Sequence, residues 1–298
     1  MKITELGEFG LIERFSKKIK LDRSVIKGAG DDCAVIDYTK EKFALFSCDM
    51  IVEGVDFTRN DSFELVGRKA LGVSLSDIAS CGGVAVYAVI SLGLPKNTDI
   101  KLFDKMTSGM LNLAREFGVN IVGGDMSVSE KIILNSSVIG YVNKKSLVLR
   151  NGAKSKDIIF VSGSLGGSIR GKHLSFVPRL REAQYLVQHY KVNSMIDISD
   201  GLLQDLGHIL SSSNAGAMLY SNLIPVAKEA RGLDEALQMG EDFELLFTVS
   251  SEQAKKIVRD RRFKFFPIGE IVNGRCGIKL FNQKGRQMRI LKTGFRHF

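Results

Sequence analysis

The sequence predicts an α+β fold with two domains in tandem. The chain has 298 residues, which at roughly 150 residues per domain favours two domains. Its hydrophobic content of 44% and charged content of 25% are typical of globular proteins and exclude a disordered chain. Strand-like and helix-like segments alternate along the chain, and a polar stretch over 143–156 interrupts them. We therefore expect an N-terminal domain over residues 1–143 and a C-terminal domain over residues 144–298.

In the first half, compact apolar runs indicate buried strands and apolar residues at helical spacing indicate helices. Gly118 is a stop signal directly after the second long helical pattern. The N-terminal 20 residues are typical of a short amphipathic helix, without the apolar region and cleavage site of a signal peptide. The expected strands are residues 42–48, 84–94, 120–122 and 131–142, and the expected long helices are residues 63–80 and 99–117.

The second half repeats this alternation with shorter segments. A Gly/Ser-rich turn over 163–168 follows its first strand, and a helix begins at Gly201 directly after another strand. The expected strands are residues 157–162, 194–198, 217–223 and 243–249, followed by short strands between 265 and 291; the expected helices include residues 180–190 and 201–212. No repeat of about 20–50 residues is present, which excludes solenoids and propellers.

Charge and cysteine usage exclude several classes of function. The formal net charge of +9 suits anionic partners such as nucleotides or phosphate esters, but no nucleic-acid recognition module accompanies it. The four cysteines are widely spaced, so we expect neither a disulfide framework nor a zinc site. No apolar run approaches about 18 residues, so we expect no membrane span. A reducing cytoplasm is the simplest compartment.

Aspartates next to glycines and at the ends of expected elements are the most informative feature. A carboxylate embedded in apolar sequence is costly to bury unless it is paired or binds a metal. Mg²⁺ prefers such oxygen ligands and usually binds carboxylates together with substrate phosphates. The set is Asp31, Asp32, Asp49, Asp77, Asp125, Asp197 and Asp200. It predicts a Mg²⁺–nucleotide site at which Asp49, Asp125, Asp197 and Asp200 converge.

Several glycines fit a phosphate-binding site, because they let backbone N–H groups approach phosphate oxygens. They are Gly28, Gly30, Gly123, Gly124 and Gly201. The familiar nucleotide and hydrolase motifs are absent: there is no G-x-x-x-x-G-K-[ST], no kinase H-R-D or D-F-G element and no G-x-S-x-G. If the chain transfers phosphoryl groups, it uses a route rich in carboxylates.

An ordered set of motifs then carries a family resemblance. The motifs are GDDCAV (30–35), SCD (47–49), VEGV (52–55), SLSDIA (74–79), GGD (123–125), DISDGL (197–202) and GEDFEL (240–245). In this order they closely resemble the thiamine-monophosphate kinase family, within the superfamily of aminoimidazole ribonucleotide synthetase and selenophosphate synthetase. The resemblance covers nearly the whole chain. It implies a two-domain ATP-binding fold like that of aminoimidazole ribonucleotide synthetase, with an active site between the domains. It also implies a homodimer in which N-terminal domains form an intersubunit barrel.

The resemblance also implies roles for individual residues. The Mg²⁺-ligand positions of the family match Asp32, Ser47, Cys48, Asp49, Asp77, Asp125, Asp197 and Asp200. Its ATP-contacting positions match Gly124, Asp125, Arg150 and Ser199, and its substrate-contacting positions match Asp56, Glu241 and Phe295. The implied reaction transfers the γ-phosphoryl group of ATP directly to thiamine monophosphate, with several Mg²⁺ ions. A phosphate monoester is already anionic at pH 7, so no covalent or general-base residue is expected.

The chain departs from the family pattern mainly on the acceptor side. Asp56 replaces a His, Cys48 replaces a Thr, and Phe295 stands where Tyr or Trp is common. Gly167 stands where the family often has Asp, and a helical stretch before Asp197 is shorter. Two alternatives therefore remain open: an ATP-dependent enzyme of the same superfamily with a different phosphate acceptor, and a non-catalytic nucleotide-binding homologue. An Asp is an anion and an acceptor only, so Asp56→His is expected to improve the use of thiamine monophosphate.

Overall fold

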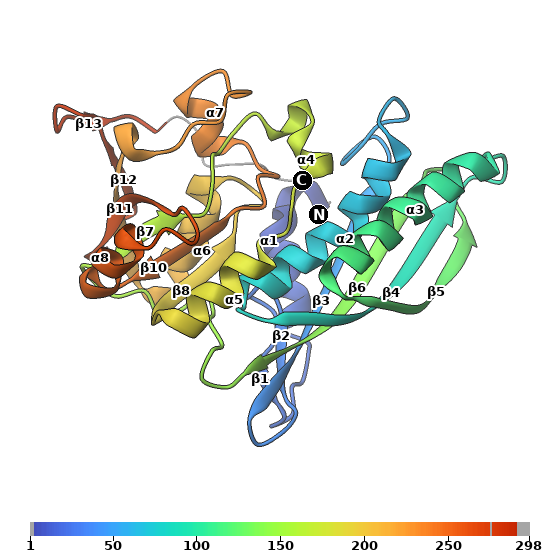
Figure 1. The fold of residues 1–298 in the computed structure, drawn as a ribbon, viewed down its shortest axis with the longest axis horizontal. Coiled ribbons are helices and arrows are strands. Elements are labelled where there is room, and N and C mark those ends of the chain that lie inside the picture. The colour runs from blue at the N-terminus through green and yellow to red at the C-terminus, as the bar shows by residue number, and fades with distance from the viewer. Residues whose placement is uncertain (1–2, 275, 291–298) are drawn as a thin grey trace.

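A computed structural model of the chain describes residues 3–274 and 276–290. Its strands form two sheets, one in each half of the chain, that lie beside each other with helices between them (Figure 1). The α+β fold with two domains that the sequence predicts is thereby confirmed, with one sheet in each half. In the described part of the chain, no helix is both long enough and apolar enough to cross a membrane.

Six strands of the first half form one sheet. They are β1 (Val25–Lys27), β2 (Ala34–Asp37), β3 (Lys42–Val52), β4 (Val84–Leu94), β5 (Asn120–Val128) and β6 (Ile133–Asn143). Their order is β1-β2-β3-β6-β4-β5, and all neighbours are antiparallel except β4 and β5. The helices of this half are α1 (Ile3–Ser16), α2 (Phe63–Ser80) and α3 (Ile100–Phe117). Helices α2 and α3 lie over one face of the sheet (Figure 1).

Two glycines allow α2 and α3 to pack with their backbones in contact. A Cβ atom on Gly67 of α2 would lie 1.9 Å from the carbonyl oxygen of Met106, and one on Gly109 of α3 would lie 1.8 Å from that of Glu64. Both distances are impossible for real atoms, so each position requires glycine. The close contact holds α2 between α3 and the second half of the chain, where it meets the functional side chains.

Seven strands of the second half form the other sheet. They are β7 (Ile158–Val161), β8 (Val192–Asp197), β9 (Ala215–Tyr220), β10 (Leu245–Val249), β11 (Phe266–Asn273), β12 (Ile278–Phe281) and β13 (Gln287–Met288), in the order β13-β12-β9-β11-β7-β10-β8. The helices are α4 (Lys172–Ser175), α5 (Leu180–His189), α6 (Leu202–Ser213), α7 (Leu233–Gln238) and α8 (Ser251–Arg259), with two short 3₁₀ turns at Ser168–Arg170 and Ser221–Leu223. Among the described strands of this sheet, β9 and β12 pair in parallel and the other neighbours are antiparallel.

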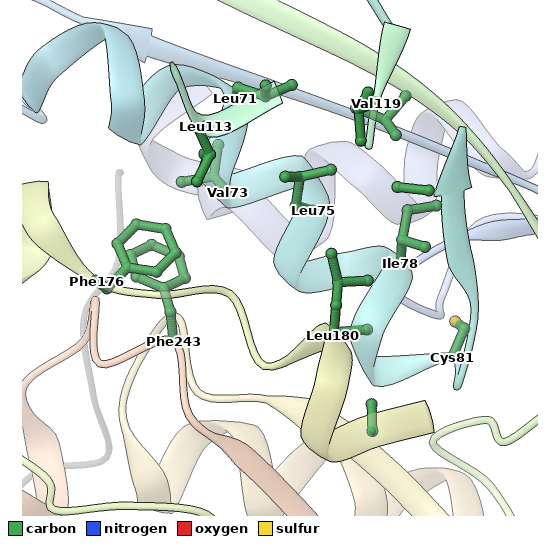
Figure 2. Packing of buried hydrophobic residues seen from close by; sticks show 14 of the residues in the cluster. Leu71, Val73, Leu75, Ile78, Cys81, Leu113, Val119, Phe176, Leu180 and Phe243 are labelled. Atoms are coloured by element: carbon green, nitrogen blue, oxygen red, sulfur yellow. The ribbon is translucent and has the colours of Figure 1, made fainter. Parts of the chain in front are cut away.

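One apolar core is continuous across the two halves. Helix α2 contacts α4, α5 and β8 of the second half. The rings of Phe176 and Phe243 stack with centroids 4.0 Å apart (Figure 2), and Phe176 packs against α2 at Gly72, where a Cβ would lie 2.9 Å from its ring. A second cluster lies around α6 in the second half. Because burial of apolar surface is the main stabilising term, the shared core fixes the two sheets relative to each other.

The uncovered face of the first sheet is apolar and exposed. Along β3, the odd residues Leu45 and Ile51 are buried under α2, whereas Phe46 and Met50 on the other face are 42% and 59% exposed. The edge strand β5 exposes side chains on both faces, with Val122 62% and Met126 64% exposed. An apolar face that ends in an open strand edge is a typical interaction surface.

Several predicted elements differ in extent from those observed. The strand expected over 120–122 continues to Val128, because its glycines and polar residues pair with β4. The strand expected over 217–223 ends at Tyr220 and continues as a 3₁₀ turn. The helical turns between Ser168 and Ser175 were not predicted, since this short segment shows no apolar period.

Candidate active site

Three carboxylates from three separate elements meet where the two sheets face each other. Asp32 lies in the turn before β2, Asp77 lies in α2, and Asp197 is the last residue of β8. One oxygen from each lies within 4.8 Å of the others. Gly30, with φ +100°, forms the tight turn that leads to Asp32. The sequence places these residues up to 165 positions apart, and packing of α2 between the sheets brings them together.

The three-carboxylate cluster is electrostatically strained. Burial raises the pKa of Asp77 well above its ordinary value, and repulsion from Asp49, Asp197 and Asp32 raises it further. Burial, followed by repulsion from Asp32, raises the pKa of Asp197 to about 8. Asp32 is buried, and among the described residues its Oδ2 atom has no hydrogen-bond partner. An unpartnered buried carboxylate oxygen beside two further carboxylates is a donor set that suits a hard divalent cation.

Serine hydroxyls connect this cluster to Asp49 on β3. The Ser47 hydroxyl lies 2.6 Å from Asp77 Oδ2 and 3.2 Å from Asp49 Oδ2, and Ser74 of α2 donates to Asp49 Oδ2 at 2.8 Å. Ser47 and Asp49 share a face of β3 because side chains alternate along a strand. Burial raises the pKa of Asp49 despite these hydrogen bonds. Of the residues predicted to bind metal, Asp32, Ser47, Asp49, Asp77 and Asp197 are thus brought together.

Cys48 points to the opposite face of β3. Its sulfur is exposed and lies 3.2 Å from both Asn135 Nδ2 and Ser137 Oγ on β6. The structure therefore does not place the Cys48 thiol with the carboxylates, so a ligand role of Cys48 would have to use its backbone carbonyl.

A second polar group lies at the start of α6. Asp200, Asp205 and His208 each offer one ligand atom within 4.8 Å of the others. The Asp205 carboxylate accepts from the backbone N–H groups of Asp200 at 3.1 Å and Gly201 at 3.0 Å, so it holds the turn after β8. Burial, then repulsion from Asp200 and Asp197, raises the pKa of Asp205, and burial lowers that of His208. Sequence reasoning predicted Asp200 but missed Asp205 and His208, whose i, i+3 spacing on the expected helix was the available signal.

Arg150 closes the other side of the three-carboxylate cluster. Its Nε donates to Asp32 Oδ1 at 3.0 Å and its Nη2 donates to the same oxygen, while its backbone N–H donates to the Asp31 carboxylate at 3.2 Å. Burial works against the charged form of Arg150, but Asp32 and Asp31 together raise the pKa of the guanidinium. Burial and repulsion from Asp32 raise the pKa of Asp31 to about 6. Arg150 is thus the cation that faces this cluster.

Residues predicted to contact ATP divide between two places. Ser199 lies between Asp197 and Asp200, and its carbonyl accepts from the Glu241 N–H at 2.7 Å. Gly124 and Asp125 lie on the exposed edge strand β5, where Asp125 pairs with Ser91 of β4. Since β5 is three strands from β3, with about 4.8 Å per strand, Asp125 lies roughly 14 Å from the strand of Asp49. Asp125 is thus not among the three carboxylates whose oxygen atoms lie within 4.8 Å of one another.

The predicted acceptor residues Asp56 and Glu241 meet at a buried lysine. Asp56 Oδ2 accepts from the Val52 N–H at 2.7 Å, and the Asp56 carbonyl accepts from Lys69 Nζ at 2.9 Å. The same ammonium forms an ion pair with Glu241. Lys69 was missed because a lysine beside an arginine in a helix usually faces solvent, although Leu65, Val66 and Val73 at helical spacing place it on the buried face. Phe295 lies outside the described residues.

Comparison with known proteins identifies the architecture. Residues 30–142 match the model of the AIR synthase related protein, N-terminal domain, and residues 131–280 match that of the C-terminal domain. A thiamine-monophosphate kinase from Buchnera aphidicola subsp. Schizaphis graminum is 34% identical over 99% of both chains. One from Bacillus subtilis is 30% identical over 98% of this chain and 100% of the relative.

A solved structure, AaThiL complexed with AMPPCP and TMP, superposes with a TM-score of 0.88 at 29% identity and covers 100% of this chain and 99% of its own. Sequence similarity and fold therefore both extend over nearly the whole chain. The chain belongs to the thiamine-monophosphate kinase family of AIR synthase related proteins.

Proposed function

We propose that the chain phosphorylates thiamine monophosphate to thiamine diphosphate with ATP as co-substrate. Its family membership and its likeness to a structure in complex with AMPPCP and TMP support this activity. The observation that carries the proposal is the cluster of Asp32, Asp77 and Asp197, with the unpartnered Asp32 Oδ2 atom. Such a cluster is costly to bury in a protein that does not use it.

We propose that several Mg²⁺ ions are held by the carboxylates. The oxygen donors, their mutual repulsion and the unpartnered Asp32 oxygen fit this ion. When bound, Mg²⁺ supplies the positive charge that offsets repulsion between two polyanionic substrates. We propose Asp32, Ser47, Cys48 through its carbonyl, Asp49, Asp77, Asp197 and Asp200 as ligands at and beside the cluster, and Asp125 on β5 as a ligand of a further ion.

The chain's own residues would act mainly by positioning. A phosphate monoester has a second pKa near 6, so the attacking oxygen of thiamine monophosphate needs no base. That oxygen forms a bond to the γ-phosphorus of ATP as the bond to the β,γ-bridging oxygen breaks and ADP leaves. Arg150, beside the carboxylates, is the side chain placed to bind the ATP phosphates together with Ser199, Gly124 and Asp125. Asp56, Glu241 and Phe295 would contact the acceptor.

We further propose that the chain forms a homodimer through the first sheet, with strands from two subunits forming a shared barrel. The exposed apolar face of β3, β4 and β5, and the open edge of β5, support this assembly. We place the domain boundary between residues 143 and 144, because the last strand of the first sheet ends at Asn143.

The test of the proposed function uses the purified full chain with ATP, Mg²⁺ and a panel of phosphate acceptors. ADP release and thiamine diphosphate are measured by anion-exchange chromatography. The proposal expects thiamine diphosphate in a 1:1 ratio to ADP. ADP release with another acceptor alone would support a different acceptor, and ATP binding without turnover on any acceptor would support a non-catalytic homologue.

A further inference from the structure

Lys69 is a buried cation that the residue roles described above do not use. It lies in the second turn of α2 with its side chain 1% exposed, and it is among the largest fully buried side chains of the described chain. A buried ammonium is costly unless charged and polar partners surround it. The groups that contact the Lys69 ammonium therefore indicate its role.

Those partners come from both halves of the molecule. Lys69 Nζ donates to the carbonyl oxygen of Asp56 at 2.9 Å, in the turn that follows β3. It also forms an ion pair with the Glu241 carboxylate, 172 residues away in the loop before β10. The Glu241 side chain is 26% exposed, so part of it remains accessible to a ligand.

The loop that carries Glu241 is held in an unfavourable backbone conformation. Glu241 has φ +62° and Phe243 has φ +49°, in the left-handed region that side chains other than glycine rarely adopt. The Glu241 N–H donates to the Ser199 carbonyl at 2.7 Å, and a Cβ on Gly240 would lie 2.2 Å from the same oxygen. The Glu241 loop thus rests directly on the turn between Asp197 and Asp200.

Helix α2 connects this contact to the three-carboxylate cluster. Ser76 lies seven residues after Lys69 and donates to Asp197 Oδ2 at 2.5 Å. Seven residues are two turns, so both side chains lie on the same face of the helix about 10.5 Å apart. One helix therefore contacts the Glu241 carboxylate through Lys69 and the Asp197 carboxylate through Ser76, two turns apart.

We infer that Lys69 is a positioning residue that holds the acceptor side of the site, namely Glu241 and the Asp56 turn, at a fixed distance from the carboxylate cluster. This inference rests on the proposed function, because it assigns the exposed part of Glu241 to the phosphate acceptor. Lys69 neutralises Glu241 from the buried side and fixes its orientation, and thiamine monophosphate meets the exposed side. Loss of Lys69 frees the Glu241 carboxylate and the Asp56 turn from their shared partner, while the backbone contact between Glu241 and Ser199 and the contacts of Arg150 to Asp32 remain.

The test compares Lys69→Met with Arg68→Met in the full chain. Arg68 precedes Lys69 in α2 and forms an ion pair with Glu116 at 2.9 Å on the α3 side, so its replacement also removes one ion pair from the same helix. KM for thiamine monophosphate, KM for ATP, kcat and the thermal midpoint are measured for each. We expect Lys69→Met to raise KM for thiamine monophosphate at least about tenfold and to leave KM for ATP within about threefold. Arg68→Met should change neither KM.

If Lys69 had a purely structural role, its replacement would change the two KM values and the thermal midpoint in a different way. Equal rises in both KM values, or a lower thermal midpoint with unchanged KM values, would overturn the inference. Should Lys69→Met fail to fold, Lys69→Gln keeps a donor for the Asp56 carbonyl and must show the same split between the two KM values. A wild-type chain that makes no thiamine diphosphate overturns the proposed function and this role together. A wild-type chain that makes it, with no split in the variants, overturns only the role of Lys69.

Discussion

Ser76 on helix α2 donates a hydrogen bond of 2.5 Å to the Asp197 carboxylate, 121 residues away at the end of β8. The next residue in the helix, Asp77, places its own carboxylate in the same cluster. Helix α2 thus contacts the second sheet directly through the Ser76 hydroxyl and places the next side chain, Asp77, within 4.8 Å of Asp197. Any movement of the two halves relative to each other would change the geometry of the cluster.

The first prediction concerns Asp77→Asn, which we expect to lower the rate of thiamine diphosphate formation by at least about 100-fold. The amide keeps the shape of the side chain but removes the negative charge that a hard cation needs. Burial and repulsion from Asp49 and Asp197 already raise the pKa of Asp77, so the neutral variant should be at least as stable as the wild type without metal. Turnover at saturating ATP and the thermal midpoint in EDTA are the measurements.

Asp104→Asn is the matched control. Asp104 is an exposed aspartate on α3 and is not one of the cluster residues, so the same substitution there removes a charge without touching the cluster. It should retain the wild-type rate. A wild-type rate for Asp77→Asn would show that Asp77 is only a structural residue of α2. An unfolded Asp77→Asn protein would contradict the expectation that relief of charge repulsion preserves stability.

The second prediction concerns the pH dependence of stability without metal. Burial raises the pKa of Asp197 to about 8 in the folded chain, whereas an unfolded aspartate titrates near 3.9. Between about pH 4 and pH 8 the folded state therefore binds a proton that the unfolded state has lost. This stabilising contribution is full below about pH 4 and is lost as the pH rises through about 8. The free energy of unfolding in EDTA should fall from pH 5 to pH 8.

Urea unfolding at several pH values, with EDTA or with Mg²⁺, measures this dependence. Asp197→Asn cannot titrate, so it should show a smaller fall in stability over the same range. Mg²⁺ should also flatten the dependence, because a bound cation favours the ionised carboxylates. Identical slopes for wild type and variant in EDTA would contradict the burial effect at Asp197.

Much of the carboxylate cluster was predictable from local sequence. Asp32, Asp77 and Asp197 stand out because each lies beside glycine or apolar residues, where an unpaired carboxylate has no ordinary structural use. Their convergence, by contrast, depends on the packing of α2 between two sheets, which no local pattern contains. Asp125 shows what local sequence cannot predict. Its GGD motif was recognisable, but its place on an edge strand follows only from the strand order of the sheet.

The burial of Lys69 and the continuation of β5 beyond Val122 escaped prediction for related reasons. The sequence around Lys69 shows an amphipathic helix with two adjacent basic residues, and only docking of the Glu241 loop makes one of them fully buried. Strand β5 continues through Gly123, Gly124 and Asp125, which have low strand propensity, because backbone pairing with β4 outweighs that preference. In both places the tertiary partner decides the local structure.

The third prediction tests the dimer face. Val122 on β5 and Val258 on α8 are equally exposed, at 62% and 61%. Val122→Asp places a charge on the apolar face that we propose to be covered by a second subunit, whereas Val258→Asp places the same charge elsewhere. Burying an unpaired charge is costly, so Val122→Asp should shift the chain toward monomer. Light scattering after size-exclusion chromatography, over a range of concentrations, measures the mass. Equal masses for both variants would exclude this face as the interface.

The last prediction concerns Asp56, whose carboxylate has two roles that can be separated. Its Oδ2 atom accepts from the Val52 N–H at 2.7 Å, so it holds the turn after β3. Its charge would repel an acceptor phosphate nearby. Asp56→Asn keeps an oxygen for Val52 and removes the charge, so stability should change by less than about 0.5 kcal/mol. Asp56→Ala loses the bond and should cost about 1 kcal/mol.

The kinetic comparison then adds Asp56→His, which restores a donor at this position. Like charges about 4 Å apart repel by about 4 kcal/mol at an effective dielectric constant of about 20, so even partial relief is measurable. We expect kcat/KM for thiamine monophosphate to rise severalfold in Asp56→Asn and at least about tenfold in Asp56→His, a gain of about 1.4 kcal/mol. KM for ATP should stay constant in both. If neither variant improves on the wild type, the Asp56 carboxylate acts only through Val52, and its charge does not face the acceptor phosphate.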